Sequence, residues 1–306
     1  MIVIIGSGIA GLACARRLAN AGHASIVLDK GRGIGGRVAT RLVGDLQFDH
    51  GAQYVNAHGV GFAAVLHGLG GTVSAWQDGT GRTHSVGVPG MSAIPKALGA
   101  GLDIQQNAQL ARLVQGGDGW MLHLNTGTMR AARVVVTVPA PQLAGLLGAD
   151  QPLVAALSPV RLAPCLTLMA AVTAPAPFIT RQDADDPLAW IAQDSAKPGR
   201  PQGQDTLWVA QAGEAFSVAH LENTPEEITA LMLPLLCDRL GVTPDDVTHA
   251  AAHRWRYARV KQALGQPFLR SPDATLYLGG DWCIGPRVEA AWTSGTAIAD
   301  DILARG

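Results

Sequence analysis

Hydrophobic residues at the start of the chain change their spacing twice, and the two changes predict a strand, a helix and a second strand. Ile2 to Ile5 is a short, uninterrupted apolar run, too short for a helix and typical of a buried parallel strand. Leu12 to Ala21 is rich in Ala and Leu and stops before Gly22, as helices often do at a glycine. Ser25 to Leu28 is again short and apolar and predicts the second strand. This order is that of a mononucleotide-binding βαβ unit.

The turn between the first strand and the helix contains three glycines in a Gly-x-Gly-x-x-Gly pattern. Gly6 permits the tight turn, Gly8 lets a pyrophosphate approach the backbone, and Gly11 lets the helix pack closely on the strand. The N-terminus of the helix offers unpaired N–H groups and the positive end of the helix dipole to the phosphates. The pattern favours a dinucleotide site over a purely structural glycine turn, but it does not identify the dinucleotide.

An acid and a second glycine-rich turn follow the second strand. Asp29 stands at the end of that strand and can accept hydrogen bonds from a pair of ribose hydroxyls. Residues 32–37 read Arg-Gly-Ile-Gly-Gly-Arg, a turn that NAD-linked Rossmann domains do not need. The alternative for this turn is a flexible surface loop with a solvated arginine.

Residues 48–54, Phe-Asp-His-Gly-Ala-Gln-Tyr, contain small residues of the kind needed where a backbone passes under a flat ring. Gly51 and Ala52 are these small residues, and Gln53 could donate a side-chain hydrogen bond toward that ring or its ligand. An ordinary loop is the alternative.

Further along the chain, alternation and turn chemistry predict more elements. A hairpin is expected across the glycine-rich residues 116–119. Thr224 as N-cap, Pro225 at the first helical position and Glu227 two residues later form a capping box, and Pro234 is a candidate kink in the helix that follows. The predicted strands cover 108–114, 120–124, 134–138 and 274–278, and the predicted helices cover 224–240 and 288–303.

These elements divide between two domains, as a length of 306 residues also suggests. The predicted fold class is α/β, with a Rossmann-like dinucleotide-binding domain and an inserted α+β substrate domain. The first domain is assigned residues 1–55, 91–141 and 271–306, and the substrate domain is assigned residues 56–90 and 142–270.

Composition and charge argue against several classes of partner and site. The net charge is −1, from 23 basic and 24 acidic residues, which suggests neither nucleic acid nor an anionic membrane as a partner. The four cysteines are far apart and form no CxxC motif, so no metal site or dithiol redox centre is expected, and their sparseness suits a reducing cytoplasm. Residues 162–179 are apolar, but prolines at 164, 175 and 177 favour a buried strand over a membrane span. A soluble, cytoplasmic protein is therefore expected.

Several sequence blocks together resemble known flavoproteins. Residues 6–11, 29–37 and 49–54 are similar to blocks of the FAD-dependent amine-oxidase superfamily, which has Gly-Gly-Arg beside the FAD pyrophosphate. Four narrower blocks resemble the bacterial renalases, and the resemblance spans essentially the whole chain. These blocks are residues 89–94 (Pro-Gly-Met-Ser-Ala-Ile), 195–200 (Ser-x-Lys-Pro-Gly-Arg), 253–259 (His-Arg-Trp-x-Tyr-Ala-Arg) and 280–292, which begins Gly-Asp-Trp-Cys.

This resemblance implies a p-hydroxybenzoate-hydroxylase-like fold with noncovalently bound FAD. It also implies oxidation of the 2-dihydro and 6-dihydro isomers of NAD(P)H to NAD(P)⁺, with O2 reduced to H2O2. Asp281 would bind the ribityl chain, and the helix start at 288–291 would stabilise negative charge at flavin N1 and O2. Many relatives have Glu where Asp29 stands, which leaves the ribose contact in place. The residues expected at the cofactor are Gly6, Gly8, Ile9, Ala10, Gly11, Asp29, Lys30, Arg32, Gly35, Gly36, Arg37, Gly51, Ala52, Gln53, Asp281, Val288, Glu289 and Ala291.

Hydride transfer from a dihydronicotinamide to flavin N5 needs no protein acid or base, because the cofactor supplies the chemistry. The protein has to hold the two rings face to face and stabilise negative charge on the flavin. Arg287 and His253 are the candidate catalytic residues: Arg287 is a cation at the start of the closing helix, and His253 could bind the nicotinamide carboxamide. Trp255 and Tyr257 alternate with His253 on one face of a predicted strand and could wall the pocket. Trp282 is a further candidate substrate contact.

Two other functions stay open. Amine oxidases place an aromatic residue where Arg287 stands and use a lysine bridged by water to flavin N5, whereas this chain has a cation there and only four lysines. A flavin- or NAD-binding protein without turnover is the second alternative.

The roles of several side chains also stay open at this point. His253, Trp255 and Tyr257 could instead belong to a core. The arginines at 254, 256 and 259 could be surface charge or could bind substrate phosphates. The sequence does not show whether the substrate is an NAD or an NADP form, and it does not show the oligomeric state.

Overall fold

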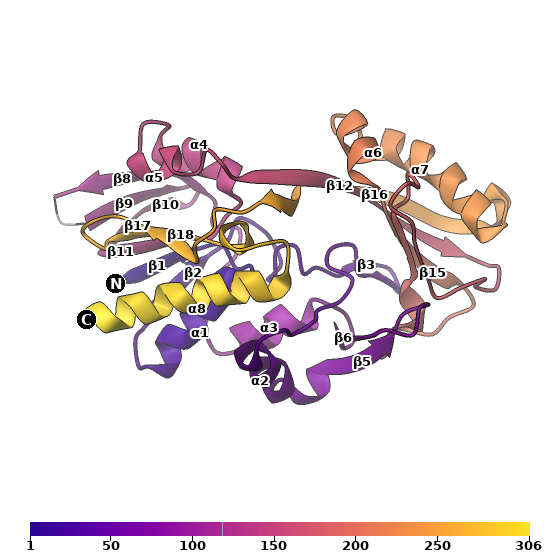
Figure 1. Cartoon of the computed structure of the whole chain (residues 1–306), viewed down its shortest axis with the longest axis horizontal. Coiled ribbons are helices and arrows are strands. Elements are labelled where there is room, and N and C mark those ends of the chain that lie inside the picture. Colours follow the sequence, from indigo (N-terminus) through magenta and orange to yellow (C-terminus); the bar gives the residue numbers. More distant parts are fainter. Residues whose placement is uncertain (118) are drawn as a thin grey trace.

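The computed structural model describes residues 1–117 and 119–306 and shows two lobes (Figure 1). The first lobe is built on a six-stranded sheet in the order β17-β18-β11-β1-β2-β7. Its strands are β1 (Ile2–Ile5), β2 (Ser25–Leu28), β7 (Asp103–Gln105), β11 (Arg133–Val136), β18 (Leu276–Gly279) and the antiparallel β17 (Phe268–Arg270). Strands from the start, the middle and the end of the chain therefore form one sheet, and the predicted Rossmann-like α/β fold is confirmed.

Both faces of this sheet are covered. On one face, Ile4 and Val135 share a core with helices α1 (Ile9–Asn20) and α8 (Val288–Arg305), which lie side by side in Figure 1. On the other face, β1 and β11 share a second core with a three-stranded sheet. That sheet consists of β8 (Leu110–Gly116), β9 (Gly119–Leu124) and β10 (Gly127–Ala131). The predicted hairpin is therefore present, and Asp118 in its predicted turn lies outside the described residues.

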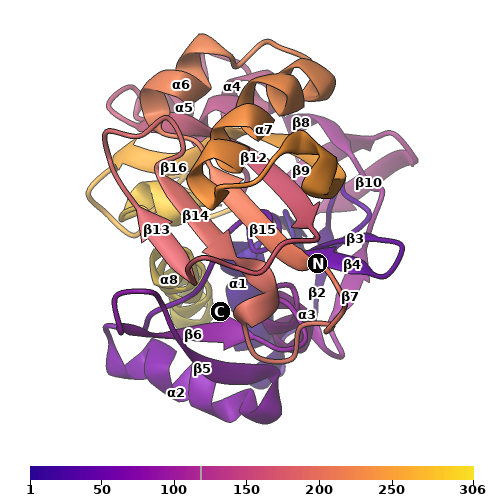
Figure 2. The same ribbon diagram turned by 90° about the vertical axis from the view of Figure 1, so that its right-hand side faces the viewer.

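The second lobe is a five-stranded antiparallel sheet in the order β13-β14-β15-β12-β16 (Figure 2). Helix α7 (Pro225–Leu240) starts with the predicted capping box of Thr224 and Glu227 and packs with α6 (Glu214–Ala219) on the outer face of the sheet. Pro234 lies inside α7, which continues beyond it. The strands are β12 (Arg161–Val172), β13 (Thr180–Gln182), β14 (Trp190–Gln193), β15 (Thr206–Gln211) and β16 (Val247–Gln262).

The apolar stretch over 162–179 forms most of β12, the strand between β15 and β16. Its side chains face two separate cores, because Leu166 and Leu168 pack toward the helices whereas Met169 and Ala171 pack toward Phe48. Burial on both faces explains why this strand reads as a continuous apolar run. Within the described residues, no helix combines the length and the apolar character that crossing a bilayer requires.

The domain boundaries differ from the predicted ones. Residues 56–90 were expected in the substrate domain, but Phe62 and Trp76 share a core with Ile9 and Ile94 of the nucleotide-binding lobe. Residues 142–160 also pack on the first lobe, and β17 joins its sheet, so the second lobe is built on residues 161–262. Changes in composition along the chain do not reveal which core a segment joins. The remaining α-helices and strands are α2 (Val60–Gly68), α3 (Ala93–Gly99), α4 (Leu143–Leu147), α5 (Pro152–Ala155), β3 (Arg41–Val43), β4 (Leu46–Phe48), β5 (Val73–Gln77) and β6 (Thr83–Gly87).

Candidate functional site

The first glycine turn has the geometry that the sequence predicts. Gly6 adopts a φ of +105°, and a Cβ at Gly11 would lie 1.9 Å from the carbonyl oxygen of Gly6. Both glycines are therefore required by the chain itself, the first for the turn and the second for close packing of α1 on β1. Gly8 differs, because its φ of −71° is ordinary and a Cβ there would meet no described atom within 4 Å. Open space above a backbone in this position fits a pyrophosphate.

Two helix N-termini open at the same edge of the sheet. Helices α1 and α8 follow the carboxyl ends of the parallel strands β1 and β18, where ligands bind in open α/β sheets. In the described part of the chain, no side chain caps α1 at Gly8 or α8 at Arg287. The N–H of Ala290 already donates to the carbonyl of Arg287 at 3.1 Å, so the groups left for a ligand are the earliest N–H groups of each helix. The helices pack closely, since a Cβ at Gly295 would lie 1.9 Å from the carbonyl oxygen of Ala10.

The second glycine turn packs against the first. Gly35 donates from its N–H to the carbonyl of Ser7 at 2.9 Å, and its φ of +116° is one that side-chain-bearing residues rarely adopt. Arg37 is not a solvated arginine: it forms a bidentate ion pair with Asp281, with N···O distances of 2.8 and 2.6 Å. Arg37 also donates to the carbonyl of Ala258 in the second lobe at 3.0 Å. Two of the predicted cofactor residues are thus brought together between the lobes.

The other charged residues near these turns have different positions. Asp29 accepts hydrogen bonds from the N–H and the hydroxyl of Ser7 at 2.6 and 2.7 Å, and from the N–H of Gly31 at 2.7 Å. It therefore braces the first glycine turn, and because a carboxylate has about four acceptor sites, it retains capacity for a ribose hydroxyl. Lys30 and Arg32 are exposed.

The structure shows what requires Gly51 and corrects the predicted role of Gln53. A Cβ at Gly51 would lie 2.0 Å from the carbonyl oxygen of Arg37, so the chain's own backbone already requires a glycine here. Ala52 donates from its N–H to that same carbonyl at 2.9 Å. The buried amide of Gln53 donates to the carbonyls of Asp49 and Gly51, at 2.5 and 3.2 Å. Gln53 therefore holds the local backbone and does not present its amide to a ligand.

The inner face of the second sheet lies over residues 48–54. Gln211 donates from its amide to the carbonyl of Gly51 at 2.8 Å, and the Trp255 indole N–H donates to the carbonyl of His50 at 2.8 Å. Cross-strand partners share a face of a sheet, so the register places further side chains on this face. Thr167 of β12 lies opposite Gln211 of β15 on one side and opposite His253 of β16 on the other. Trp190 lies opposite Gln211, and Trp255 lies opposite Cys165.

Three aromatic side chains form a cluster on this face, which we call the histidine–tryptophan cluster: His50, His253 and Trp255. Ring centroids lie 4.4 Å apart for His253 and Trp255, 5.2 Å for His50 and Trp255, and 4.9 Å for the two histidines. Burial is the largest cause that lowers the pKa of His253 to about 4 and the pKa of His50 to about 3. The positive charge of Arg41 also lowers both pKa values. Both imidazoles are therefore neutral at neutral pH.

Arg41 also determines which ring nitrogen of His253 carries the hydrogen. Arg41 Nη2 lies 3.4 Å from His253 Nδ1. A guanidinium only donates, so Nδ1 is the acceptor and the hydrogen is assigned to Nε2. His253 can then donate from Nε2 to a carbonyl oxygen such as that of a carboxamide. Sequence reasoning predicted His253 and Trp255 here but missed His50 and Arg41, which come from the other lobe.

The structure separates the three arginines of β16. Arg254 donates to the carbonyls of Leu221 and Asn223, at 2.6 and 3.3 Å, and Arg256 pairs with Glu222 at 2.7 and 2.8 Å. Both therefore hold the loop before α7. Arg259 is exposed. Its partner on β12 is Ala163 and that of Trp255 is Cys165, so both side chains are on the same face of the sheet, with a register shift between them. Tyr257 is partly exposed.

Two predicted site residues are placed elsewhere. Trp282 has no exposed surface, donates to the carbonyl of Val138 at 3.0 Å and packs in the core of the first lobe, so it does not wall a substrate site. Glu289 accepts from the N–H groups of His58 and Gly59 at 2.9 and 2.7 Å and thus fixes the start of α2. Its carboxylate therefore braces α2 against α8 rather than binding the cofactor. Arg287 is exposed at the N-cap of α8.

Sequence reasoning also missed a buried ionic cluster of Asp49, Asp194, Lys197 and Arg200. The available signal was the Ser-x-Lys-Pro-Gly-Arg block, which the resemblance picked out without a role. Partners for these charges come from a segment nearly half the chain away and could not be read from spacing.

The two cysteines near the site have raised pKa values: burial raises the pKa of Cys165, opposite Trp255, to about 11. Cys283 has no exposed surface, and burial raises its pKa to about 12, which suits a noncovalent cofactor. Across residues 1–117 and 119–306, no group of His, Cys, Asp and Glu side chains has the arrangement of a metal site.

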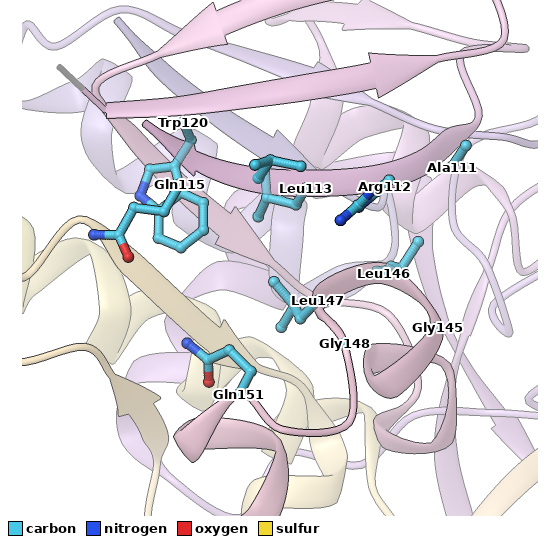
Figure 3. Close-up of a pocket in the computed structure, with 11 residues that line it drawn as sticks. Ala111, Arg112, Leu113, Gln115, Trp120, Gly145, Leu146, Leu147, Gly148 and Gln151 are labelled. Carbon is cyan, nitrogen blue, oxygen red and sulfur yellow. The ribbon is translucent and has the colours of Figure 1, made fainter. Parts of the chain in front are cut away.

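A separate cavity of about 340 Å³ lies between β8 and α4 (Figure 3). It is lined by apolar side chains such as Leu113, Leu147 and Trp120, together with the polar Arg112 and Gln151. None of the predicted cofactor or substrate residues lines it, so it does not belong to the site described above.

Comparisons with known proteins agree with this architecture. A family described as flavin containing amine oxidoreductase matches residues 73–303, and an NAD(P)-binding Rossmann-like domain matches residues 4–64. Among solved structures, putrescine oxidase bound to putrescine has a TM-score of 0.77 at 14% identity, covering 99% of both chains. A putative protoporphyrinogen oxidase from Exiguobacterium sp. 255-15 has a TM-score of 0.79 at 14% identity, covering 100% of this chain and 99% of the other. Cyclohexylamine oxidase from Brevibacterium oxydans IH-35A has a TM-score of 0.75 at 13% identity, covering 99% and 98%. At these identities the structural matches show a shared fold.

Proposed function

Since the chain belongs to the family of flavin-containing amine oxidoreductases and is an FAD-dependent oxidoreductase, we propose that it oxidises dihydronicotinamide dinucleotides. The proposed substrates are the 2-dihydro and 6-dihydro isomers of NAD(P)H, and the products are NAD(P)⁺ and, from O2, H2O2. Bound FAD supplies the chemistry, because it accepts the hydride and passes electrons to O2. The sequence blocks that resemble bacterial renalases support this choice within the family.

The observation that carries the proposal is the chemical character of the histidine–tryptophan cluster. Its two imidazoles are neutral, and the charges that act on them are the guanidinium groups of Arg41 and Arg254 and the carboxylate of Asp49. Among the described residues, Asp49 and Asp281 are already paired with arginines or a lysine, so an ammonium substrate would meet cations without an unpaired carboxylate from either acid. A dinucleotide with two phosphates and an aromatic ring is a better chemical match.

The lysines also argue against amine oxidation. Lys197 is the one buried lysine, and its ammonium donates to Asp194, Asp49 and Gln53, at 2.6, 3.4 and 3.2 Å. An ammonium has three N–H groups, so no donor remains for a water at flavin N5. The other three lysines, Lys30, Lys96 and Lys261, are exposed.

In this proposal the chain's own residues bind and orient. The N-terminus of α1 and Gly8 hold the pyrophosphate, and the N-terminus of α8 stabilises negative charge on the ring. His253 donates from Nε2 to the carboxamide of the substrate, and Trp255 covers the nicotinamide. Arg259 and Arg41 are the cations proposed to bind substrate phosphates.

Anaerobic bleaching of the bound flavin tests this function. The 2-dihydro and 6-dihydro isomers should reduce the flavin quickly, whereas ordinary 4-dihydro NADH should reduce it poorly and putrescine not at all. Faster bleaching by putrescine than by the 2-dihydro isomer would establish amine oxidation instead. Bleaching without H2O2 formation on admitting O2 would favour a binding protein without turnover.

A further inference from the structure

Four charged side chains lie between the two lobes almost without contact with solvent. The exposed fractions are 0% for Asp49 and Asp194, 1% for Lys197 and 3% for Arg200. Lys197 Nζ lies 2.6 Å from Asp194 Oδ1 and 3.4 Å from Asp49 Oδ2, and Arg200 Nη2 lies 2.5 Å from Asp49 Oδ2. Two acids and two bases balance in charge. Buried charges are costly to desolvate, so a cluster of this kind needs a reason beyond stability.

Arg200 and Asp49 connect the cluster to the surrounding backbone. One Arg200 nitrogen donates to the carbonyls of Gly87 and Pro89, each at 2.7 Å. Asp49 Oδ1 accepts from the N–H of Met91 at 2.8 Å and from the Thr40 hydroxyl at 2.7 Å. These contacts lock segments that are far apart in sequence into one arrangement.

Lys197 connects the cluster to the backbone over Gly51–Gln53. Its third hydrogen bond goes to Gln53 Oε1 at 3.2 Å. Because Lys197 can only donate and the carbonyls of Asp49 and Gly51 can only accept, the Gln53 amide has a single satisfied orientation. The lysine therefore fixes the amide, and the amide fixes the carbonyls of Asp49 and Gly51.

From Gly51 the contacts continue to the predicted cofactor residues. Gly51 packs against the carbonyl of Arg37, and Ala52 donates to that carbonyl at 2.9 Å. Arg37 in turn pairs with Asp281. A continuous set of contacts thus joins a buried lysine of the second lobe to the residues expected around FAD.

We propose that Lys197 is a positioning residue for the FAD-dependent reaction. Its ammonium, oriented by Asp194 and Asp49, holds Gln53 and through it the backbone of Gly51 and Ala52 at the isoalloxazine ring. This inference rests on the proposed FAD-dependent function and on the placement of residues 51–53 beside that ring, which the sequence predicts. It assigns Lys197 a role without direct contact with substrate, unlike the water-bridging lysine of amine oxidases.

The test uses two variants of the FAD-loaded protein. Asp194→Asn combined with Lys197→Met keeps the cluster neutral, because it leaves Asp49 paired with Arg200. Gln53→Met leaves all four charges in place and removes only the amide. Both variants should bind FAD more weakly in apoprotein titrations and should shift the visible spectrum and the midpoint potential of bound FAD. Lys261→Met, at an exposed lysine that pairs with Glu214, is the matched control and should change none of these.

Rates of anaerobic flavin reduction give a second measurement. The limiting rate per bound flavin should fall about ten- to a hundred-fold in both variants, because small misplacements of reacting groups have effects of that size. Combining the variants should add little, since both interrupt the same contacts. A wild-type spectrum, potential and FAD affinity in Gln53→Met would overturn the proposal, as would a wild-type limiting rate per bound flavin. Spectrum, potential and affinity need no substrate, so they still decide the matter if the dihydronicotinamides prove inactive and the proposed function fails.

Discussion

At the scale of single residues, the glycines of the first turn are alike in sequence but not in what requires them. Gly11 has no room for a side chain, since its Cβ would lie 1.9 Å from a backbone oxygen. Gly8 has an ordinary φ and open space above it. The protein's own packing explains why residue 11 is a glycine, and a bound pyrophosphate explains why residue 8 is a glycine.

Gly8→Val should therefore fold normally and purify with little FAD. Its side chain would occupy open space in the apoprotein but would clash with a pyrophosphate at the start of α1. The visible absorbance of the flavin relative to protein measures FAD content, and circular dichroism melting of the apoproteins measures folding. Gly145→Val is the matched control, because Gly145 also has open space and lies on α4, away from the site. Full flavin occupancy in Gly8→Val would refute the assignment of this turn.

Arg287 is the second prediction at this scale. Its guanidinium lies at the N-cap of α8 and is exposed, and Glu289 binds α2 rather than Arg287. Arg287→Ala should lower flavin reduction by the 2-dihydro isomer roughly ten- to a hundred-fold, as expected on losing a charge-assisted hydrogen bond. Stopped flow across substrate concentrations assigns the loss to the limiting rate or to binding. Arg130→Ala, on exposed β10, should leave both unchanged, and wild-type kinetics in Arg287→Ala would remove it from the site.

At the scale of elements, β16 contacts the first lobe, whereas α7 stabilises the second lobe itself. The pairing of β16 with β12 is irregular between Trp255 and Arg259, and the carbonyl of Ala258 in this irregularity accepts from Arg37. Such irregularities re-aim a strand locally. On the outer face, α7 contributes Ile228, Met232 and Leu236 to the core of the lobe.

The capping box of α7 gives a prediction for this element. Thr224→Ala removes the hydroxyl that accepts from the N–H of Glu227 at 3.2 Å and should cost about 1 kcal/mol of stability. The melting temperature of the FAD-loaded protein should fall by a few degrees, with flavin content and reduction rate unchanged. Thr128→Ala, on β10 of the first lobe, serves as the control for a threonine that caps no helix. A loss of flavin from Thr224→Ala would show that α7 affects the site, contrary to this prediction.

At the scale of the whole molecule, the lobes meet through residues 48–54 and the charges around them. His50 comes from the first lobe and His253 from the second, and the pKa of each imidazole lies below the ordinary value of 6.5. The folded state therefore resists protonation that the unfolded chain accepts. Contact between the lobes is consequently linked to pH.

Stability should fall as the pH is lowered from about 7 toward 4. Between the ordinary histidine pKa of 6.5 and the lowered values of about 4 and about 3, the unfolded chain binds more protons, so unfolding becomes easier as pH falls. Chemical denaturation of the FAD-loaded protein across this range measures the slope. His253→Gln should flatten it, whereas His67→Gln, at an exposed histidine, should not. Carboxylates with lowered pKa, such as Asp49, contribute mainly below about pH 4 and so act in a different window. An unchanged slope in His253→Gln would show that this histidine is not the cause.

The sequence alone determined what depends on local periodicity and turn chemistry. The βαβ unit, the glycine turns, the hairpin after Ala108, the capping box at Thr224 and the closing helix all appear where the pattern predicts them. These features can be predicted from the sequence because each depends on residues only a few positions apart. The histidine and tryptophan of β16 were also predicted together, because alternation along a strand puts them on one face.

Only the tertiary structure decided which partner each polar group has. The Gln53 amide was predicted to reach the ring or its ligand, yet its partners are Lys197 and two backbone carbonyls. Trp282 was predicted to contact substrate but is buried in the core. Residues 56–90 were predicted in the substrate domain but pack on the first lobe. Spacing along a chain cannot encode these outcomes, because they arise when two lobes pack and buried polar groups must find partners from distant segments. The same packing pairs Asp49 with Lys197, and so creates the arrangement from which the positioning role of the lysine is inferred.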